Sequence, residues 1–169
     1  NFKTLGGVSV HENSSPAYQD YRRAWMEYPL KFILREFPLH LDIESTSVCN
    51  LKCTFCDKLP VLKKNQLGFL DFSLYKKIID EGARYGLCGV KLSYRGEPLL
   101  HNDIAEMVAY AKAKGILDVY FNTNGMLLTE EMSEKLIDSG LNRISISVEG
   151  IDPAAFEKER IGAKFGVIL

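Results

Sequence analysis

The stretch Gly115-Ile-Leu-Asp-Val-Tyr-Phe-Asn-Thr-Asn-Gly125 carries the pattern that decides the fold. It begins with a glycine suited to the left-handed residue that ends a helix, continues through an apolar and β-branched core, and ends with a polar residue before a second glycine. The same pattern recurs over residues 86–96 and 140–150. The repeated unit predicts the end of a helix, then a strand, then a turn.

Helical patterns separate the three copies. Apolar residues recur at helix-like spacing after Asp71, after Asn102-Asp103 and after Thr129, and these polar residues can cap the first N–H groups of each helix. The alternating segment 39–44 predicts one more strand ahead of the copies. The order is βαβαβαβ followed by the start of a fourth helix, an α/β architecture that requires a parallel sheet with right-handed crossovers.

A separate lead-in precedes this alternation. Residues 1–15 are polar and irregular, and from there to residue 37 apolar side chains recur at helical intervals that Pro29 interrupts, so we expect a pair of helices. We therefore predict an N-terminal arm and helical lead-in over residues 1–37 and a main domain over residues 38–169.

The composition excludes several classes of protein. With 46% hydrophobic residues the 169-residue chain has enough apolar side chains for a packed core, so a disordered tail is excluded. A balance of 21 basic and 22 acidic side chains gives no overall field for nucleic acid or an anionic membrane. No apolar run approaches the roughly 20 residues that span a bilayer. We expect a cytoplasmic protein that binds neither nucleic acid nor membrane.

The two ends of the sequence are unusual. The chain begins at Asn1 without an initiator methionine and ends on the apolar segment 165–169, which has no helix stop signal and no polar tail. We expect a fragment of a longer protein.

Unusual residues follow each predicted strand. In parallel α/β sheets, functional groups gather where strands end and helices begin, so these residues are expected to share one mouth of the sheet. In chain order they are three cysteines at 49, 53 and 56, then Arg95-Gly96-Glu97-Pro98, then Asn122-Thr123-Asn124-Gly125, then Ser147-Val148-Glu149-Gly150.

The three clustered cysteines indicate a metal site. Cys49, Cys53 and Cys56 have C-x3-C-x2-C spacing, which lets one short loop wrap three thiolates around an inorganic cluster. A [4Fe-4S] cluster has four irons, so three ligands leave one iron open. Cys88 lies at the start of its predicted strand, roughly 20 Å from the mouth, and is expected to serve packing instead of the cluster.

The cysteine spacing, with Phe55 just before the third cysteine, resembles the hallmark of the radical S-adenosylmethionine (SAM) enzymes, and residues 95–98 resemble their Gly-Gly-Glu-Pro element with Arg95 in place of the first glycine. The resemblance implies a partial (β/α) barrel of the radical SAM type, here about its first four βα units, in which the cysteines hold the cluster and SAM chelates the open iron. It implies a SAM-cleaving oxidoreductase or transferase whose 5′-deoxyadenosyl radical takes hydrogen from a substrate, with an electron donor such as a flavodoxin or ferredoxin.

The resemblance also implies which residues contact SAM. Phe55 is expected near the adenine, and Glu97 with the Gly96 backbone is expected to meet the methionine ammonium. Asn122 and Asn124 are expected to line the cavity.

Further contacts are implied from the fourth strand onward. Ser147 and Arg160 resemble positions that contact the SAM carboxylate, a suitable use of a hydroxyl and a guanidinium. Glu149 is expected to reach the ribose hydroxyls, although Glu149 and Arg160 can also form a surface ion pair of little energetic value. Residues 159–165 resemble the opening of the family's fourth helix. The role of Arg95 stays open between a contact to SAM or substrate and a change in the loop.

The motifs at 95–101 and 147–152 most resemble members that carry an added cysteine-rich cluster domain of the SPASM type. Those relatives act on peptides, proteins or small molecules, and the sequence does not select among them. The alternative is a non-catalytic metal-binding module: a structural zinc site with His101 as a fourth ligand, or an electron-transfer iron–sulfur site.

Overall fold

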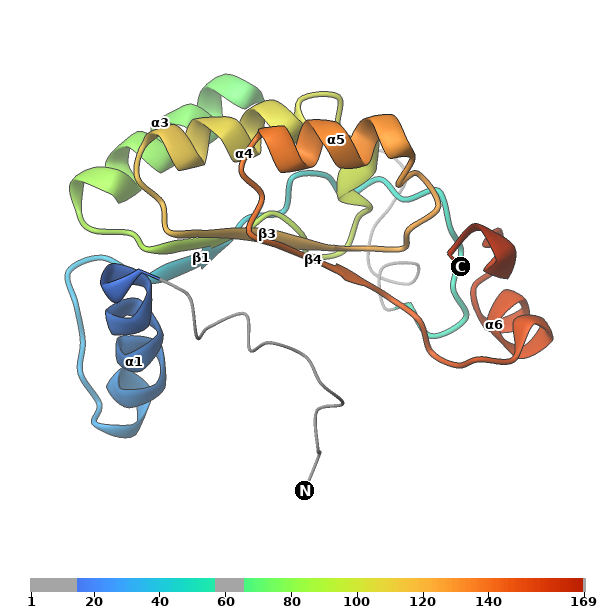
Figure 1. The fold of residues 1–169 in the computed structure, drawn as a ribbon, viewed down its shortest axis with the longest axis horizontal. Helices are drawn as coiled ribbons and strands as arrows, with labels where there is room; N and C mark the ends of the chain where they lie inside the picture. Colours follow the sequence, from blue (N-terminus) through green and yellow to red (C-terminus); the bar gives the residue numbers. More distant parts are fainter. Residues whose placement is uncertain (1–14, 57–65, 169) are drawn as a thin grey trace.

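Four parallel strands form one sheet in the computed structural model, which describes residues 15–56 and 66–168. The strands lie in chain order, as β1 (His40–Asp42), β2 (Gly89–Lys91), β3 (Asp118–Thr123) and β4 (Arg143–Ile146). Three helices cover one face of this sheet (Figure 1): α3 (Phe72–Arg84), α4 (Ile104–Ala113) and α5 (Glu130–Asp138). The predicted parallel α/β architecture is confirmed.

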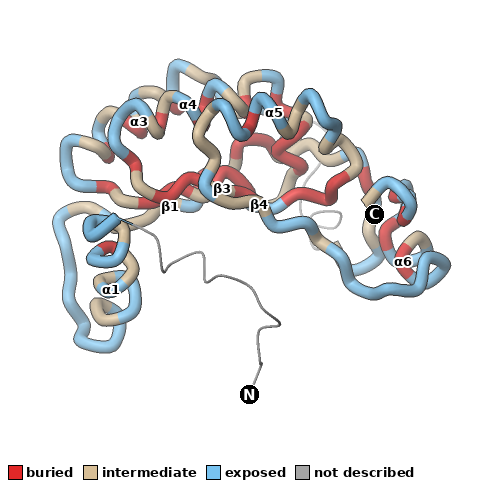
Figure 2. The backbone as a smooth tube through the Cα atoms, in the orientation of Figure 1, coloured by how far each residue is buried: buried red, intermediate tan, exposed pale blue. Residues whose placement is uncertain are grey.

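The main core lies between the sheet and these helices. Val90, Val119 and Phe121 point from β2 and β3 into a buried cluster that includes Ile79 of α3 and Met107 of α4. Figure 2 shows buried residues in the strands at the centre of the sheet and in the helices that cover it, and β2 and β3 carry the buried positions of the sheet. Burial of this apolar surface sets the register of the sheet and so fixes where the strands end.

The glycines that open the three copies of the repeat behave as predicted. Gly86, Gly115 and Gly140 precede β2, β3 and β4 with φ of 79°, 84° and 84°, the left-handed conformation that ends a helix. Of the expected helix caps, Asp71 and Thr129 accept hydrogen bonds from the backbone at the start of α3 and α5.

The capping prediction is wrong for α4. Asp103 occupies the N-cap position of this helix but makes no side-chain capping bond. Its own backbone N–H instead donates to His101 Nδ1 at 3.1 Å. A histidine two residues earlier therefore organises this turn.

The predicted pair of N-terminal helices is wrong. Residues 16–30 form a single helix, α1 (Pro16–Leu30), whose last turn contains Pro29. The chain leaves the helix through Phe32, which adopts a positive φ of 52°. The five residues between Phe32 and Pro38 are too few for a second helix ahead of β1, because an isolated helix of that length is unstable.

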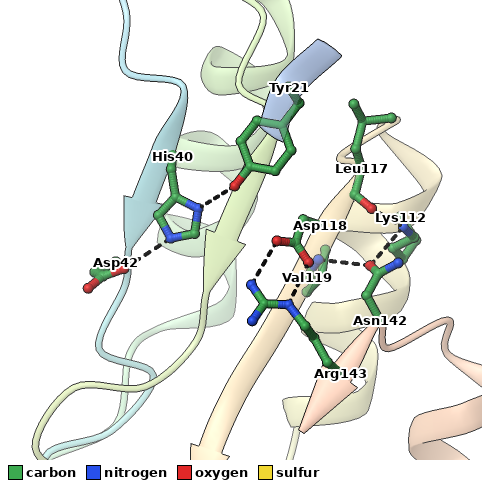
Figure 3. A network of polar contacts seen from close by, with 9 residues as sticks. All are labelled: Tyr21, His40, Asp42, Lys112, Leu117, Asp118, Val119, Asn142 and Arg143. Carbon is green, nitrogen blue, oxygen red and sulfur yellow. Dashed lines mark hydrogen bonds and ion pairs between the residues drawn. The ribbon is translucent and has the colours of Figure 1, made fainter. Parts of the chain in front are cut away.

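Helix α1 docks at the amino ends of the strands, where its buried Tyr21 meets His40 of β1 (Figure 3). The hydroxyl of Tyr21 lies 3.1 Å from His40 Nδ1, and His40 Nε2 lies 3.1 Å from Asp42. A Cβ on Gly89 would stand 2.5 Å from the Tyr21 oxygen, so β2 needs a glycine where the helix approaches. Nearby, Arg143 makes two hydrogen bonds to the buried Asp118 and joins β4 to β3.

The expected position of the fourth helix is also wrong. Helix α6 (Pro153–Glu159) starts at the capping residue Asp152 and ends where the helix was predicted to begin. The Asp-Pro pair is a strong helix start, since Asp caps and Pro suits the first turn, and Gly162 with φ of 99° continues the chain in a non-helical direction. The residues after α6 turn back and pack on the cysteine loop.

This return is held by backbone hydrogen bonds and a second apolar cluster. Lys52 N–H donates to Ile161 O and Thr54 N–H donates to Glu159 O, both at 2.9 Å. The cluster is made of Leu51, Phe156, Ala163 and Phe165, the last from the 3-10 turn Phe165–Val167. The cysteine loop is therefore packed between the sheet and the C-terminal segment.

Across residues 15–56 and 66–168, no helix combines the length and the apolar character that crossing a membrane requires.

Candidate functional site

A cavity of about 310 Å³ lies at the carboxyl ends of the four strands. Each of the four loops predicted to converge contributes to its wall, so the expected single mouth is present. Ten of the eleven residues predicted for the site line it: Cys49, Cys53, Phe55, Cys56, Gly96, Glu97, Asn122, Asn124, Ser147 and Arg160. The eleventh, Glu149, is outside the lining but contacts Arg160.

The three cysteines are partly buried on one side of this cavity. The sulfur of Cys49 accepts a hydrogen bond from Leu51 N–H at 3.5 Å, with the Asn124 amide at 3.9 Å. Burial raises the pKa of the Cys53 thiol, while the charge of Arg160 opposes that shift. In the described parts of the chain, no three His, Cys, Asp or Glu side chains are gathered tightly enough to hold a single metal ion.

The chemistry of these donors nevertheless fits an iron–sulfur cluster. Three thiols from one short loop face one cavity, and a cluster is wider than a single ion, so its ligands stand further apart. Cys49, Cys53 and Cys56 are the residues that would hold it.

Cys88 and His101 lie outside the cavity lining. Cys88 precedes β2 at the opposite end of the strand, where its thiol contacts Gly86 O at 3.4 Å and burial raises its pKa. Both ring nitrogens of His101 are engaged with the backbone, at Leu70 O (2.9 Å) and Asp103 N (3.1 Å). Neither side chain is placed to act as a fourth ligand.

Glu97 is the acidic side chain in the lining of this cavity and is only 2% exposed. Its carboxylate accepts hydrogen bonds from Leu99 N–H at 3.1 Å, Thr123 Oγ1 at 2.6 Å and Asn124 N–H at 2.7 Å. A buried carboxylate requires such donors, because desolvation of an unpaired charge is very costly. Glu97 therefore joins the loop after β2 to the end of β3.

Gly96 brings that loop against the start of the cysteine loop. A Cβ on Gly96 would lie 1.9 Å from Thr46 O and 2.8 Å from Val48 O, so only glycine fits. The next residue continues the contact, since Glu97 N–H donates to Val48 O at 2.8 Å.

Asn124 connects the end of β3 to the cysteine loop. Its side-chain amide donates to Asn50 Oδ1 at 2.7 Å, and its Oδ1 accepts from Met126 N–H at 2.9 Å. Asn122 is held through its backbone, whose N–H donates to Ser93 Oγ at 3.0 Å.

Arg160 is buried and makes two hydrogen bonds to Glu149. These bonds raise the pKa of Arg160 and lower that of Glu149. The guanidinium also lies over the ring of Phe55, 5.6 Å from its centroid. Arg160 and Glu149 thus form the ion pair that the sequence suggested, with Arg160 inside the cavity wall and Glu149 partly exposed.

Sequence reasoning missed several residues of the wall. They are Leu51, Ser93, Tyr94 and Thr123. Glu44, which is outside the lining but holds Arg95, was missed as well. Thr123 lies inside the predicted Asn-Thr-Asn-Gly motif, so its position was available from the sequence, whereas its bond to Glu97 depends on the spacing of neighbouring strands.

Comparison with known proteins agrees with this geometry. Residues 43–167 match the family model described as the Radical SAM superfamily. A probable GTP 3′,8-cyclase of Methanococcus maripaludis is 33% identical over 136 residues, covering 76% of this chain and 41% of the relative. Another, of Sulfolobus acidocaldarius, is 38% identical over 124 residues, covering 70% and 36%. The chain thus spans about two fifths of the length of these curated relatives.

Solved structures share the fold. Streptococcus suis SuiB bound to precursor peptide SuiA superposes with a TM-score of 0.63 at 22% identity, covering 95% of this chain and 36% of that one. BtrN in complex with AdoMet and 2-DOIA gives 0.61 at 20% identity, covering 80% and 55%. Since the family model covers most of the sequence, including the cysteine loop and all three later motifs, the chain belongs to the radical SAM superfamily.

Proposed function

We propose that this chain supplies the part of a radical SAM enzyme that binds a [4Fe-4S] cluster and SAM. The observation that carries the proposal is the convergence of four separate loops on one cavity, with ten of the residues expected for this chemistry in its wall. When bound, the cluster supplies one electron that cleaves SAM to methionine and a 5′-deoxyadenosyl radical, which takes a hydrogen atom from the substrate.

Glu97 is suited to the methionine ammonium. A carboxylate offers about four acceptor sites, and the bonds to Leu99, Thr123 and Asn124 use three of them. Glu97 and Gly96 both line the cavity, which supports a role for both residues in holding an ammonium group.

Arg160 is suited to the SAM carboxylate. A guanidinium has five N–H donors, and Glu149 occupies two of them. The others are available to a carboxylate that Ser147 can also reach with its hydroxyl, because both residues line the same cavity. Glu149 holds the arginine and is proposed to reach the ribose hydroxyls.

The aromatic and amide residues complete the proposed SAM contacts. Phe55 is 56% exposed and lines the cavity, which suits a ring that covers the adenine. Asn122 and Asn124 contribute polar groups to the wall between the cysteine loop and β4.

We propose that residues 1–37 form an N-terminal arm and helical lead-in and that residues 38–169 form part of a radical SAM core. An electron donor such as a flavodoxin or ferredoxin, a cytoplasmic location and a SPASM-type subfamily belong to this proposal. The similar proteins support more than one substrate class, because their names describe a GTP cyclase and an enzyme bound to a precursor peptide. GTP and a peptide are therefore the first substrates to test.

The experiment is anaerobic reconstitution of the full-length protein with iron and sulfide. The expected result is broad visible absorption of an iron–sulfur cluster and, with a strong reductant, formation of 5′-deoxyadenosine from SAM. The Cys53→Ala variant should lose both, and the matched Cys88→Ala variant should keep both. A protein that holds only zinc and does not cleave SAM would be the non-catalytic alternative and would overturn the proposal.

A further inference from the structure

Arg95 stands in the cavity wall where the motif that it resembles has a glycine, and one acidic residue holds it there. Its Nε donates to Glu44 Oε1 and its Nη2 to Glu44 Oε2, each at 3.3 Å. The backbone N–H of Arg95 donates to the same Oε1 at 3.0 Å. A single carboxylate thus fixes both the side chain and the main chain of Arg95.

The position of this pair connects two strands. Glu44 follows β1 just before the cysteine loop, and Arg95 follows β2, so the pair joins the carboxyl ends of neighbouring strands. The next residue is Gly96, which packs directly against Thr46 O. The pair therefore begins a continuous series of contacts that ends at the Glu97 carboxylate.

The charge of Arg95 is already matched by Glu44. Both side chains are partly buried, which strengthens a two-point charged contact relative to an exposed one. The guanidinium carbon also lies 5.3 Å from the ring centroid of Tyr94, which is 66% exposed at the cavity. This arrangement favours a structural role for the Arg95 guanidinium over binding of an anionic ligand.

We infer that Glu44 and Arg95 form a positioning pair, in which Glu44 compensates for an arginine at a glycine position and holds residues 95–97 so that Gly96 and Glu97 face the cavity. This inference rests on the proposed function, because the residues it positions are those proposed to bind SAM. The pair acts through Gly96 and Glu97 and not by contact with SAM.

The test is a double-mutant cycle in the full-length protein with Glu44→Gln, Arg95→Gly and the double variant. Each single change leaves one charged partner unmatched, so SAM should bind about tenfold more weakly, with unchanged iron content and unchanged rate at saturating SAM. The double variant should recover to within about threefold of the wild type, since the amide oxygen introduced by Glu44→Gln can still accept from the N–H of residue 95. Glu131→Gln, which breaks an exposed pair with Lys135, is the matched control and should change nothing.

A second readout does not depend on SAM. Amide hydrogen exchange at residues 95–97 should be faster in each single variant and near wild type in the double variant. If Arg95→Gly alone weakens SAM binding as much as the double variant while Glu44→Gln has no effect, then Arg95 contacts the ligand directly and the inference is wrong. Failure of the proposed function would give a different result, because the wild-type protein itself would not cleave SAM. The hydrogen-exchange pattern at residues 95–97 would still show whether Glu44 and Arg95 act as a pair.

Discussion

The hydroxyl of Thr123 donates a hydrogen bond of 2.6 Å to Glu97, and both side chains are buried. Replacement of Thr123 by Val keeps the branched shape but removes the hydroxyl, so the Glu97 carboxylate loses one of its three bonds and Gly125 N–H loses its acceptor, Thr123 Oγ1, at 3.1 Å. We expect unfolding to require about 1–3 kcal/mol less free energy, measured by urea titration, because the acceptor is charged and buried.

The matched control for this change is Thr54→Val, which removes a hydroxyl bonded to Glu159 at an exposed site. That bond competes with water, so its loss should cost at most about 0.5 kcal/mol. Equal losses in the two variants would contradict the role assigned to Thr123.

Glycine 96 provides a second prediction. In Gly96→Ala the new methyl group would stand 1.9 Å from Thr46 O, closer than any real contact, so the two loops must separate. We expect a loss of about 1–3 kcal/mol in stability and weaker SAM binding, measured by thermal unfolding and equilibrium dialysis.

Gly150→Ala is the control, because no atom lies within 4 Å of a Cβ built there and its φ is not positive. This variant should stay within about 0.5 kcal/mol of the wild type. A Gly96→Ala protein as stable as Gly150→Ala would show that the loops can move apart freely.

How far the sequence predicts this fold is clear from its glycines. Gly86, Gly115 and Gly140 sit at helix ends whose left-handed backbone strongly favours glycine, so the sequence states the geometry directly. The convergence of the loops follows as well, since parallel strands must place their carboxyl ends together. The glycine signal is local and the loop convergence follows from topology, so both can be predicted from the sequence alone.

Other features depend on packing that no local pattern expresses. The helical periodicity beyond Pro29 predicted a helix, yet the left-handed Phe32 sends the chain away from one. Family resemblance placed a helix start near residue 159, although Asp152-Pro153 is the stronger start signal. The pairing of Glu44 with Arg95 spans 51 positions and becomes visible only once β1 and β2 are adjacent.

A third prediction separates the iron–sulfur proposal from a zinc site that uses His101. Because both ring nitrogens already bind Leu70 O and Asp103 N, His101→Phe removes two backbone partners. We expect stability to fall by about 1–3 kcal/mol while the iron bound per chain stays the same.

Cys56→Ala is the comparison, and it should lower bound iron as far as Cys53→Ala does. Metal analysis of purified protein after anaerobic reconstitution measures both. Loss of metal in His101→Phe, at a temperature where the variant remains folded, would restore the zinc interpretation.

The contact between α1 and the sheet should depend on pH through His40. Burial lowers the pKa of His40 from its ordinary value of 6.5, against the opposing effects of Asp42 and Asp118. The unfolded chain therefore binds a proton at higher pH than the folded chain. The stability contributed by neutral His40 is complete above pH 6.5 and is lost as pH falls from there toward the lower folded pKa.

The variant His40→Gln tests this directly, because glutamine can accept from Tyr21 and donate to Asp42 without titrating. The free energy of unfolding, measured by urea titration between pH 7.5 and 5.5, should fall more steeply for the wild type than for the variant. The extra fall should reach at most about 1.4 kcal/mol for each unit of difference between the folded and unfolded pKa of His40. Arg143 also faces this region, but its hydrogen bonds to Asp118 help to raise its pKa above the ordinary arginine value, so it does not add to the slope. Parallel pH profiles would mean that His40 is protonated equally in both states and that its folded environment does not favour the neutral ring.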